Sequence, residues 1–148
     1  MFHFLGTCSF ETNWANDEFS RDTSGLALAR TQITDGHVLP FGEVNCDKLR
    51  HFIAPAAKSL DARSRNSALG RAMARVSAHE IYHMLTGSET HAATAIAGSS
   101  HSRTELTVQT FSFARAETEW LRTWVERQTR IIQEEQAIKA ELVASASR

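Results

Sequence analysis

The sequence predicts an α+β fold in which a small β-hairpin or sheet packs on one central helix and a long helix ends the chain. Three observations predict it: an Asp-Gly pair between two short apolar segments, a helical run containing the pattern His-Glu-x-x-His, and apolar side chains at helical spacing near the C-terminus. We expect an irregular N-terminal arm over residues 1–24, which is rich in Asn, Asp, Ser and Thr. A central domain over residues 25–115 and an amphipathic helix over residues 116–148 follow.

Two strands joined by a tight turn form the predicted hairpin. Residues 26–33 alternate enough to be a strand, and Asp35-Gly36 is a strong signal for a two-residue hairpin turn. Residues 38–44 form the return strand, where Pro40 is best tolerated at the edge of a sheet. This return strand is therefore either a plain edge strand or a site where an extended substrate pairs with the backbone.

Two weaker helices flank the central one. Residues 47–60 carry apolar side chains at helical spacing, with Asn45 or Asp47 as the N-cap and Pro55 as a point where the helix can break. Residues 104–110 have the composition of a short helix.

The central helix covers at least residues 69–85, which contain no proline. Three residues can cap its start: Ser64, Asn66 and Ser67. Four side chains lie on one stripe of it: Ala72, Val76, His79 and His83. Gly87 can close its end in a left-handed conformation. Because the apolar stripe leads into the two histidines, we expect their rings to point into the protein.

The chemistry of this helix is that of a metal site. His79 and His83 stand four residues apart, so both imidazoles can reach one ion from the same helical face. Zinc takes nitrogen ligands at about 2.0–2.1 Å, and catalytic zinc keeps a coordination position for water beside three protein ligands. Glu80 lies about 100° round the helix from His79, where a carboxylate can accept a proton from that water without binding the metal.

A third ligand must come from outside the helix. His91 is the leading candidate, because it follows the turn at Gly87 that lets the chain fold back. Glu105 is its main rival, either as a ligand or as an acceptor for the ring N–H of a ligand histidine. His101 is a third alternative, in a stretch of Gly and Ser.

Uncharacterised bacterial zinc metallopeptidases that are distantly metzincin-like resemble this chain in the run Leu69-Gly70-Arg71-Ala72-Met73-Ala74-Arg75-Val76-Ser77-Ala78-His79-Glu80-Ile81-Tyr82-His83-Met84-Leu85. The similarity extends over about residues 24–115, and it implies that the central helix is an active-site helix. The resemblance implies a Zn²⁺ site held by His79, His83 and His91, with Glu80 as general base and a peptide or protein as substrate. Ala95-Ile96-Ala97 stands where such chains have Gly-Ile-Met or Gly-Ile-Ala.

Composition excludes several other classes of protein. The chain has 148 residues and a formal net charge of −1, so we expect neither nucleic acid nor a membrane surface as a partner. The sequence shows no signal peptide or transmembrane segment, so the compartment is unknown, with the cytoplasm as the default expectation. The region before the hairpin is short for a zinc peptidase, which suggests a shortened N-terminus. Cys8 and Cys46 can pair or stay reduced, depending on that compartment.

Two alternatives to an active peptidase stay open. The domain can be a non-catalytic zinc-binding or degenerate peptidase module that acts through interactions. The C-terminal helix, with apolar residues recurring over 114–145, can also form a homodimer, or it can be a solvated amphipathic helix.

Overall fold

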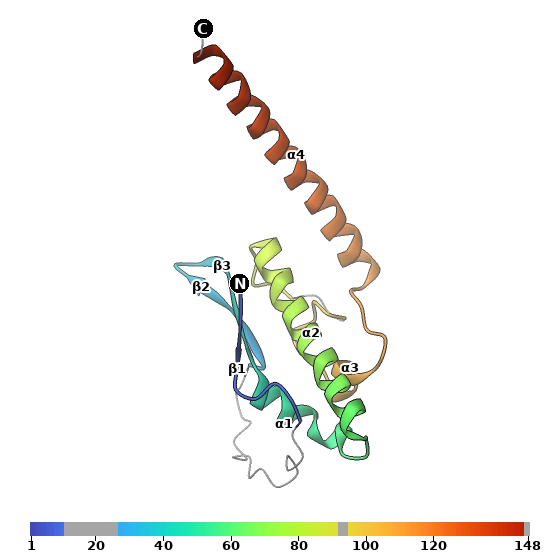
Figure 1. The fold of residues 1–148 in the computed structure, drawn as a ribbon. Helices are drawn as coiled ribbons and strands as arrows, with labels where there is room; N and C mark the ends of the chain where they lie inside the picture. The colour runs from blue at the N-terminus through green and yellow to red at the C-terminus, as the bar shows by residue number, and fades with distance from the viewer. Residues whose placement is uncertain (11–26, 92–94, 147–148) are drawn as a thin grey trace. The chain divides into compact units, whose positions relative to one another are not determined.

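The computed structural model describes residues 1–10, 27–91 and 95–146. It has the predicted α+β fold, with a three-stranded mixed sheet and four helices in these ranges (Figure 1). The chain divides into two compact units, Met1–Ser112 and Phe113–Arg148. The elements are β1 (Phe2–Leu5), β2 (Ala29–Thr34), β3 (His37–Asn45), α1 (Cys46–Ala57), α2 (Ala62–Thr86), α3 (Arg103–Thr107) and α4 (Arg115–Ala146).

The predicted hairpin is confirmed. β2 and β3 run antiparallel and are joined through Asp35 and Gly36, whose φ angles of 51° and 75° are both positive. Two positive φ angles in succession are the signature of the type I′ turn, which matches the twist of the flanking strands. The register of the pair shifts between Val38 and Gly42, and Pro40 falls in this irregular stretch, where it removes no regular ladder bond.

The prediction of an irregular arm is wrong for Phe2–Leu5, which form β1 and pair in parallel with β3. The N-terminal ammonium donates to the carbonyl of Pro40 at 2.6 Å, and the N–H of Gly42 donates to the carbonyl of Met1 at 3.0 Å. A strand of this length has too few residues to show an alternation, and its partner lies about forty residues away. Residues 11–24 of the predicted arm lie outside the described residues.

The strand order β1-β3-β2 also corrects the position of the return strand. β3 is the central strand, because β1 pairs with one of its edges and β2 with the other. Pro40 is tolerated by the register shift and not by an edge. Among the described residues, β1 and β2 are the two edge strands of the sheet.

Side-chain caps fix the starts of α1 and α2. Asn45 caps α1, as predicted, by accepting a hydrogen bond from the N–H of Lys48 at 2.9 Å, and Pro55 lies inside the helix without ending it. α2 begins earlier than predicted, because Asp61 accepts from the N–H of Ser64 at 2.8 Å and is the N-cap. Gly87 ends α2 with a φ of 62°, as predicted.

The core of the first unit lies where the sheet, α1, α2 and α3 meet. Ala72 and Val76, which the sequence places on the inner stripe of α2, are both buried. Arg75 is buried beside them and donates to the carbonyls of Glu105 at 2.8 Å and Val108 at 2.6 Å, which fastens α3 to α2. The buried cluster consists of Phe10, Val44, Leu49, Ile53, Ala57, Leu69, Ala72, Val76 and Leu106.

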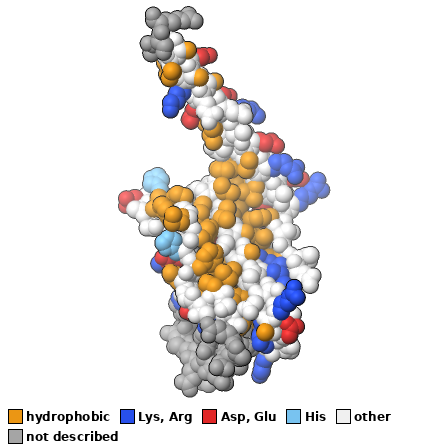
Figure 2. Space-filling view, viewed as in Figure 1, with side chains coloured by type: hydrophobic (Ala, Val, Ile, Leu, Met, Phe, Trp, Pro, Cys, Tyr) orange, Lys and Arg blue, Asp and Glu red, His pale blue; other side chains and the backbone are white. Residues whose placement is uncertain are grey.

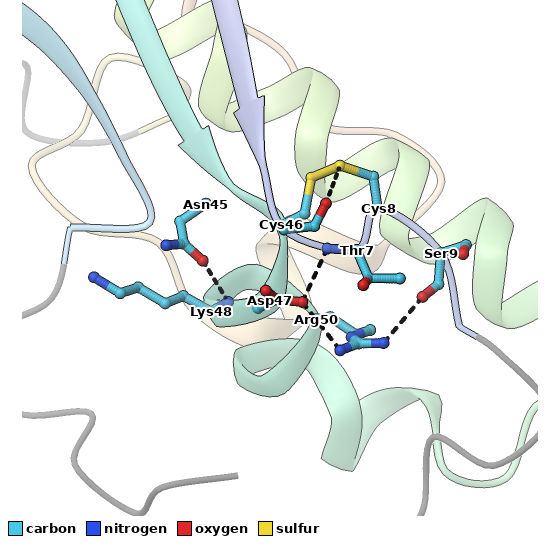
Figure 3. The surroundings of a disulfide bond; sticks show 9 residues. Thr7, Cys8, Ser9, Asn45, Cys46, Asp47, Lys48 and Arg50 are labelled. Atoms are coloured by element: carbon cyan, nitrogen blue, oxygen red, sulfur yellow. Dashed lines mark hydrogen bonds and ion pairs between the residues drawn. A yellow bond between two sulfur atoms is a disulfide. The ribbon is translucent and has the colours of Figure 1, made fainter. Parts of the chain in front are cut away.

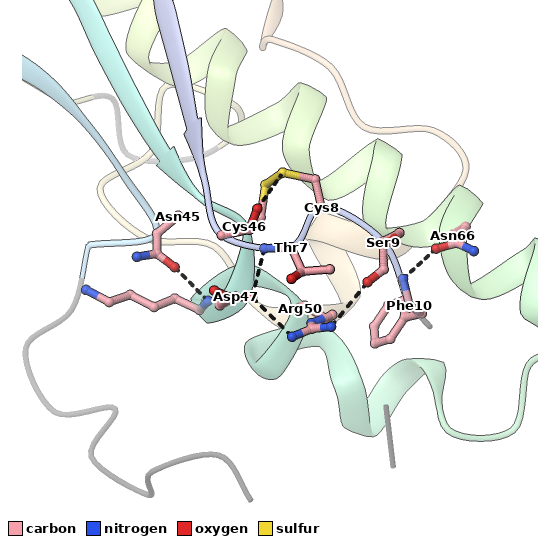
Figure 4. A network of polar contacts seen from close by, with 11 residues as sticks. Thr7, Cys8, Ser9, Phe10, Asn45, Cys46, Asp47, Arg50 and Asn66 are labelled. Carbon is pink, nitrogen blue, oxygen red and sulfur yellow. Dashed lines mark hydrogen bonds and ion pairs between the residues drawn. A yellow bond between two sulfur atoms is a disulfide. The ribbon is translucent and has the colours of Figure 1, made fainter. Parts of the chain in front are cut away.

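Cys8 and Cys46 form a disulfide bond, which settles the alternative left open by the sequence (Figure 3). Beside the bond, Asp47 accepts from the N–H of Thr7 at 3.0 Å and from the guanidinium of Arg50 at 3.1 Å. Arg50 also donates to the carbonyl of Ser9 at 3.3 Å, as Figure 4 shows. The segment after β1 is therefore held to the start of α1 by covalent and polar contacts together.

α4 is a continuous helix, as predicted. Several of its apolar side chains are exposed, and Figure 2 shows them at intervals along the helix. Homodimerisation through this helix stays a prediction. No helix in the described residues is both long enough and apolar enough to cross a membrane. The exposed apolar residues are Trp120, Val125, Ile131, Ile132, Ile138, Leu142 and Val143.

Candidate metal centre

The last two turns of α2 carry the first two candidate ligands. His79 and His83 lie one turn apart on the inner face, and their ring centroids are 4.7 Å apart with the planes at 81°. The Nε2 atoms of the two rings approach to 3.0 Å. The two rings lie edge to face with their Nε2 atoms adjacent, so both Nε2 atoms point at a common position, as ligands of one shared ion must.

His91 completes the group from beyond the Gly87 turn. Its ring stacks on that of His79 at 5.1 Å and meets that of His83 at 4.8 Å. One ring nitrogen from each of the three histidines lies within 4.8 Å of the others. His79, His83 and His91 are therefore close enough to hold one metal ion, as the sequence predicts.

Backbone carbonyls decide which ring nitrogens are available. Nδ1 of His79 lies 2.7 Å from the carbonyl oxygen of Ile96, and Nδ1 of His83 lies 2.6 Å from that of Ser88. A carbonyl oxygen can only accept, so each Nδ1 must carry the ring proton. Both neutral rings then present an unprotonated Nε2. Ligand histidines commonly donate their other N–H in this way, which fixes the orientation of the ring.

The two Nε2 lone pairs therefore face each other at 3.0 Å. This arrangement is repulsive unless a cation, either a proton or a metal ion, lies between them. Tetrahedral zinc with Zn–N distances of about 2.0–2.1 Å separates two of its nitrogen ligands by about 3.3–3.4 Å. The observed separation is within a few tenths of an ångström of that value, so the residues fit a metal ion of this size.

The protein surroundings favour the metal-binding form of His79, which is partly buried, and of His91, which is exposed. Desolvation lowers the pKa of His79, against an opposing hydrogen bond to Ile96 and the nearby charge of Glu80. Desolvation also lowers the pKa of His91, and the neighbouring His83 and His79 lower it further. A metal ligand must be neutral, so both shifts widen the pH range over which these imidazoles can bind.

Glu80 lies beside the three histidines and is not one of the group. The residue is only 7 % exposed, and its Oε2 accepts a hydrogen bond of 2.7 Å from the hydroxyl of Thr31 on β2. Oε1 has no hydrogen-bond partner within the described part of the chain, and it is not fully shielded from solvent there. One carboxylate oxygen is thus fixed by the protein, and the other remains accessible.

The two rival ligands have other surroundings. Oε2 of Glu105 accepts from the N–H of Ser102 at 2.7 Å in a capping box at the start of α3, and that contact lowers the pKa of Glu105. The ring of His101 meets that of His79 edge to face at 5.5 Å and that of Phe111 at 5.6 Å. Neither residue belongs to the group that can share an ion in the described ranges.

His101 is nevertheless part of the wall around the site. Both of its ring nitrogens are buried and have no hydrogen-bond partner among the described residues, and burial lowers its pKa. Its ring contact with His79 and the carbonyl of Ile96 both restrict the orientation of that ligand.

A cleft of about 1520 Å³ gives access to the histidines. Its lining includes residues 27–31, which lead into β2 and begin it, and also His79, Glu80, His83 and His91. Sequence reasoning did not identify Thr31, nor the carbonyl groups of Ser88 and Ile96. A backbone carbonyl leaves no trace in residue type, and a threonine in a strand is too common to indicate a functional contact.

A scan against protein-family models finds no matching family, and searches of the curated proteins and of the solved structures find no significant match.

Proposed function

We propose that this chain is a zinc-dependent hydrolase, and specifically a metallopeptidase. The observation that carries the proposal is the convergence of three imidazoles, two of them with Nε2 freed by carbonyl contacts, next to a buried carboxylate in an accessible cleft. Three nitrogen ligands favour zinc over Mg²⁺ or Ca²⁺, which prefer oxygen. Three protein ligands also leave a position for water, as in catalytic zinc sites.

Zinc bound by these histidines would lower the pKa of a coordinated water to about 7 and polarise a carbonyl group. Glu80 supplies the proton transfers: its accessible Oε1 accepts a proton from the water as the oxygen attacks the peptide carbonyl. The same carboxyl group then gives that proton to the leaving amine as the C–N bond breaks. Glu80 is little exposed, so few water molecules surround its carboxylate and its interaction with the reacting groups is stronger than in bulk water.

The outer edge of β2, with which no strand of the described residues pairs, supports a peptide as substrate. The N–H of Asn45 donates to the carbonyl of Leu28 at 3.0 Å, and Arg30 pairs with Glu43 in the same register. Because alternate residues of an antiparallel strand point their backbone groups to opposite sides, the N–H and C=O groups of Ala29 and Thr31 face away from β3. An extended peptide can pair with these groups along the wall of the cleft.

Metal content and cleavage together test the proposal. We expect about one zinc per chain in the purified protein and in a Glu80→Gln variant, with cleavage of a mixed peptide library by the parent only. A His91→Ala variant loses both zinc and cleavage. His37→Ala, at the exposed end of the hairpin, is the matched control and behaves as the parent does.

Three results would count against this function, each in its own way. Cleavage by the Glu80→Gln variant at the parental rate contradicts the role of the carboxylate. Absence of zinc at saturating metal contradicts the site itself. Stoichiometric zinc in a parent protein that cleaves no peptide supports a zinc-binding interaction module instead.

A further inference from the structure

We propose that Thr31 is a positioning residue that holds the Glu80 carboxylate in place for proton transfer, an inference that rests on the proposed hydrolase function. Thr31 lies on β2 and Glu80 on α2, forty-nine residues apart in the sequence. The Oγ1 atom of Thr31 lies 2.7 Å from Oε2 of Glu80 and 3.2 Å from the carbonyl oxygen of the same residue. The contact therefore ties the edge of the sheet to the helix that carries two of the metal ligands.

A hydroxyl group has one proton to donate, and the distances indicate where it goes. A charged carboxylate is the stronger acceptor, and 2.7 Å is close to the usual length of an O–H···O⁻ hydrogen bond. The longer contact to the backbone carbonyl is secondary. A buried carboxylate without a donor carries a large desolvation cost, and Thr31 is the donor that Glu80 has within the described residues.

This contact makes the two carboxylate oxygens different. With Oε2 occupied by the hydroxyl of Thr31, the lone pairs of Oε1 are the ones left for a water molecule. Rotation of the carboxylate would break the hydrogen bond, so the accepting oxygen stays in one orientation. A base held in this way needs little reorganisation when the proton is transferred.

The position of Thr31 also connects the base with the substrate. Its backbone N–H and C=O face the outer edge of β2, where the proposed function places an extended peptide, and its side chain contacts Glu80. Movement of the strand relative to α2 would shift the peptide and strain the hydrogen bond that orients the base. One residue thereby keeps the bond to be cleaved and the proton acceptor in register.

The first test compares three variants of the zinc-loaded protein on one peptide substrate. Thr31→Val removes the hydroxyl at nearly constant shape, Thr31→Ser keeps it, and Thr34→Val makes the same change at an exposed position on the same strand. We expect Thr31→Val to lower kcat by about 10- to 100-fold with zinc content unchanged and KM within about threefold, since a misplaced group costs about this much. Thr31→Ser and Thr34→Val retain at least about a third of the parental kcat.

A second test needs no activity and uses the metal-free protein. Denaturant unfolding is measured for the parent, Thr31→Val, Glu80→Ala and the double variant. We expect Thr31→Val to lower the folding equilibrium constant about 10-fold in the parent and by less than about threefold when Glu80 is already alanine, because the donor matters only while its acceptor is present.

The outcomes separate this proposal from the proposed function. If Thr31→Val weakens folding equally in both backgrounds, or changes KM and zinc content instead of kcat, Thr31 does not position Glu80. Failure of serine to restore kcat also overturns it. If the parent holds zinc but cleaves nothing, the hydrolase function fails, and the unfolding measurements still decide whether the Thr31 hydroxyl holds the carboxylate.

Discussion

Opening the Cys8–Cys46 disulfide is expected to remove a large part of the stability of this small protein. The bond joins residues separated by thirty-eight positions and connects the segment after β1 to the first residue of α1 (Figure 3). Without it, β1 keeps only its parallel pairing with β3 and the polar contacts around Asp47. The unfolded chain, in contrast, gains the freedom that the covalent loop denied it.

The magnitude follows from the length of that loop. For a loop of this length, the chain-entropy relation gives a change of about 13 cal/mol/K, or about 3.9 kcal/mol at 25 °C. Domains of this size are stable by about 5–15 kcal/mol in total. Loss of the bond is therefore expected to remove a large fraction of the free energy of unfolding while the folded state remains the more stable one.

Denaturant unfolding in three states of the protein measures this loss. The oxidised parent is compared with the parent reduced by a phosphine and with a Cys8→Ala, Cys46→Ala double variant; thiol reductants are avoided because thiolates bind zinc. We expect both reduced forms to lose about 3–4 kcal/mol, and the double variant slightly more, since Cys46 is fully buried. A loss below about 1 kcal/mol, or an effect of the phosphine on the double variant, would refute the reasoning.

Two further predictions concern backbone and helix-cap residues. Ala95 has a left-handed φ of 63°, so Ala95→Gly is expected to raise the free energy of unfolding by about 0.5–1 kcal/mol. Urea titration measures this change, and a loss of stability would show that this φ is not strained. The N–H and then the hydroxyl of Ser64 lower the pKa of Asp61, so its contribution is complete above the unfolded value of 3.8 and is lost as the pH falls through the folded pKa. Thermal unfolding of Asp61→Ala should accordingly depend less on pH below about pH 4 than that of the parent, and unchanged dependence would contradict this cap.

The parts of the fold that the sequence predicted correctly are set by neighbouring residues. The turn at Asp35-Gly36 needs two positive φ angles, which these residue types adopt readily. The stripe of α2 is a repeat of 3.6 residues, so the inward direction of His79 and His83 follows once the apolar positions are known. In each case the information lies within a few residues of the structure that it determines.

The features that the sequence analysis missed or misplaced depend on residues that lie far apart in the sequence. β1 pairs with residues about forty positions away, and no short pattern in Phe2–Leu5 reveals the partner. The central position of β3 depends on that pairing, so the prediction of an edge there failed with it. The contact between Thr31 and Glu80 spans a similar distance and depends on how the sheet packs on α2. Such contacts require the folded chain.

The third ligand shows where local and distant information meet. The sequence placed His91 after a glycine turn, and the left-handed Gly87 indeed ends α2 before that residue. The turn also brings the carbonyl of Ser88 to Nδ1 of His83, so one loop supplies a ligand and orients another. Glu105 was a reasonable rival by residue type, but a capping box at the start of α3 already uses its carboxylate. Competition between a metal and a helix terminus for the same side chain is decided by tertiary structure.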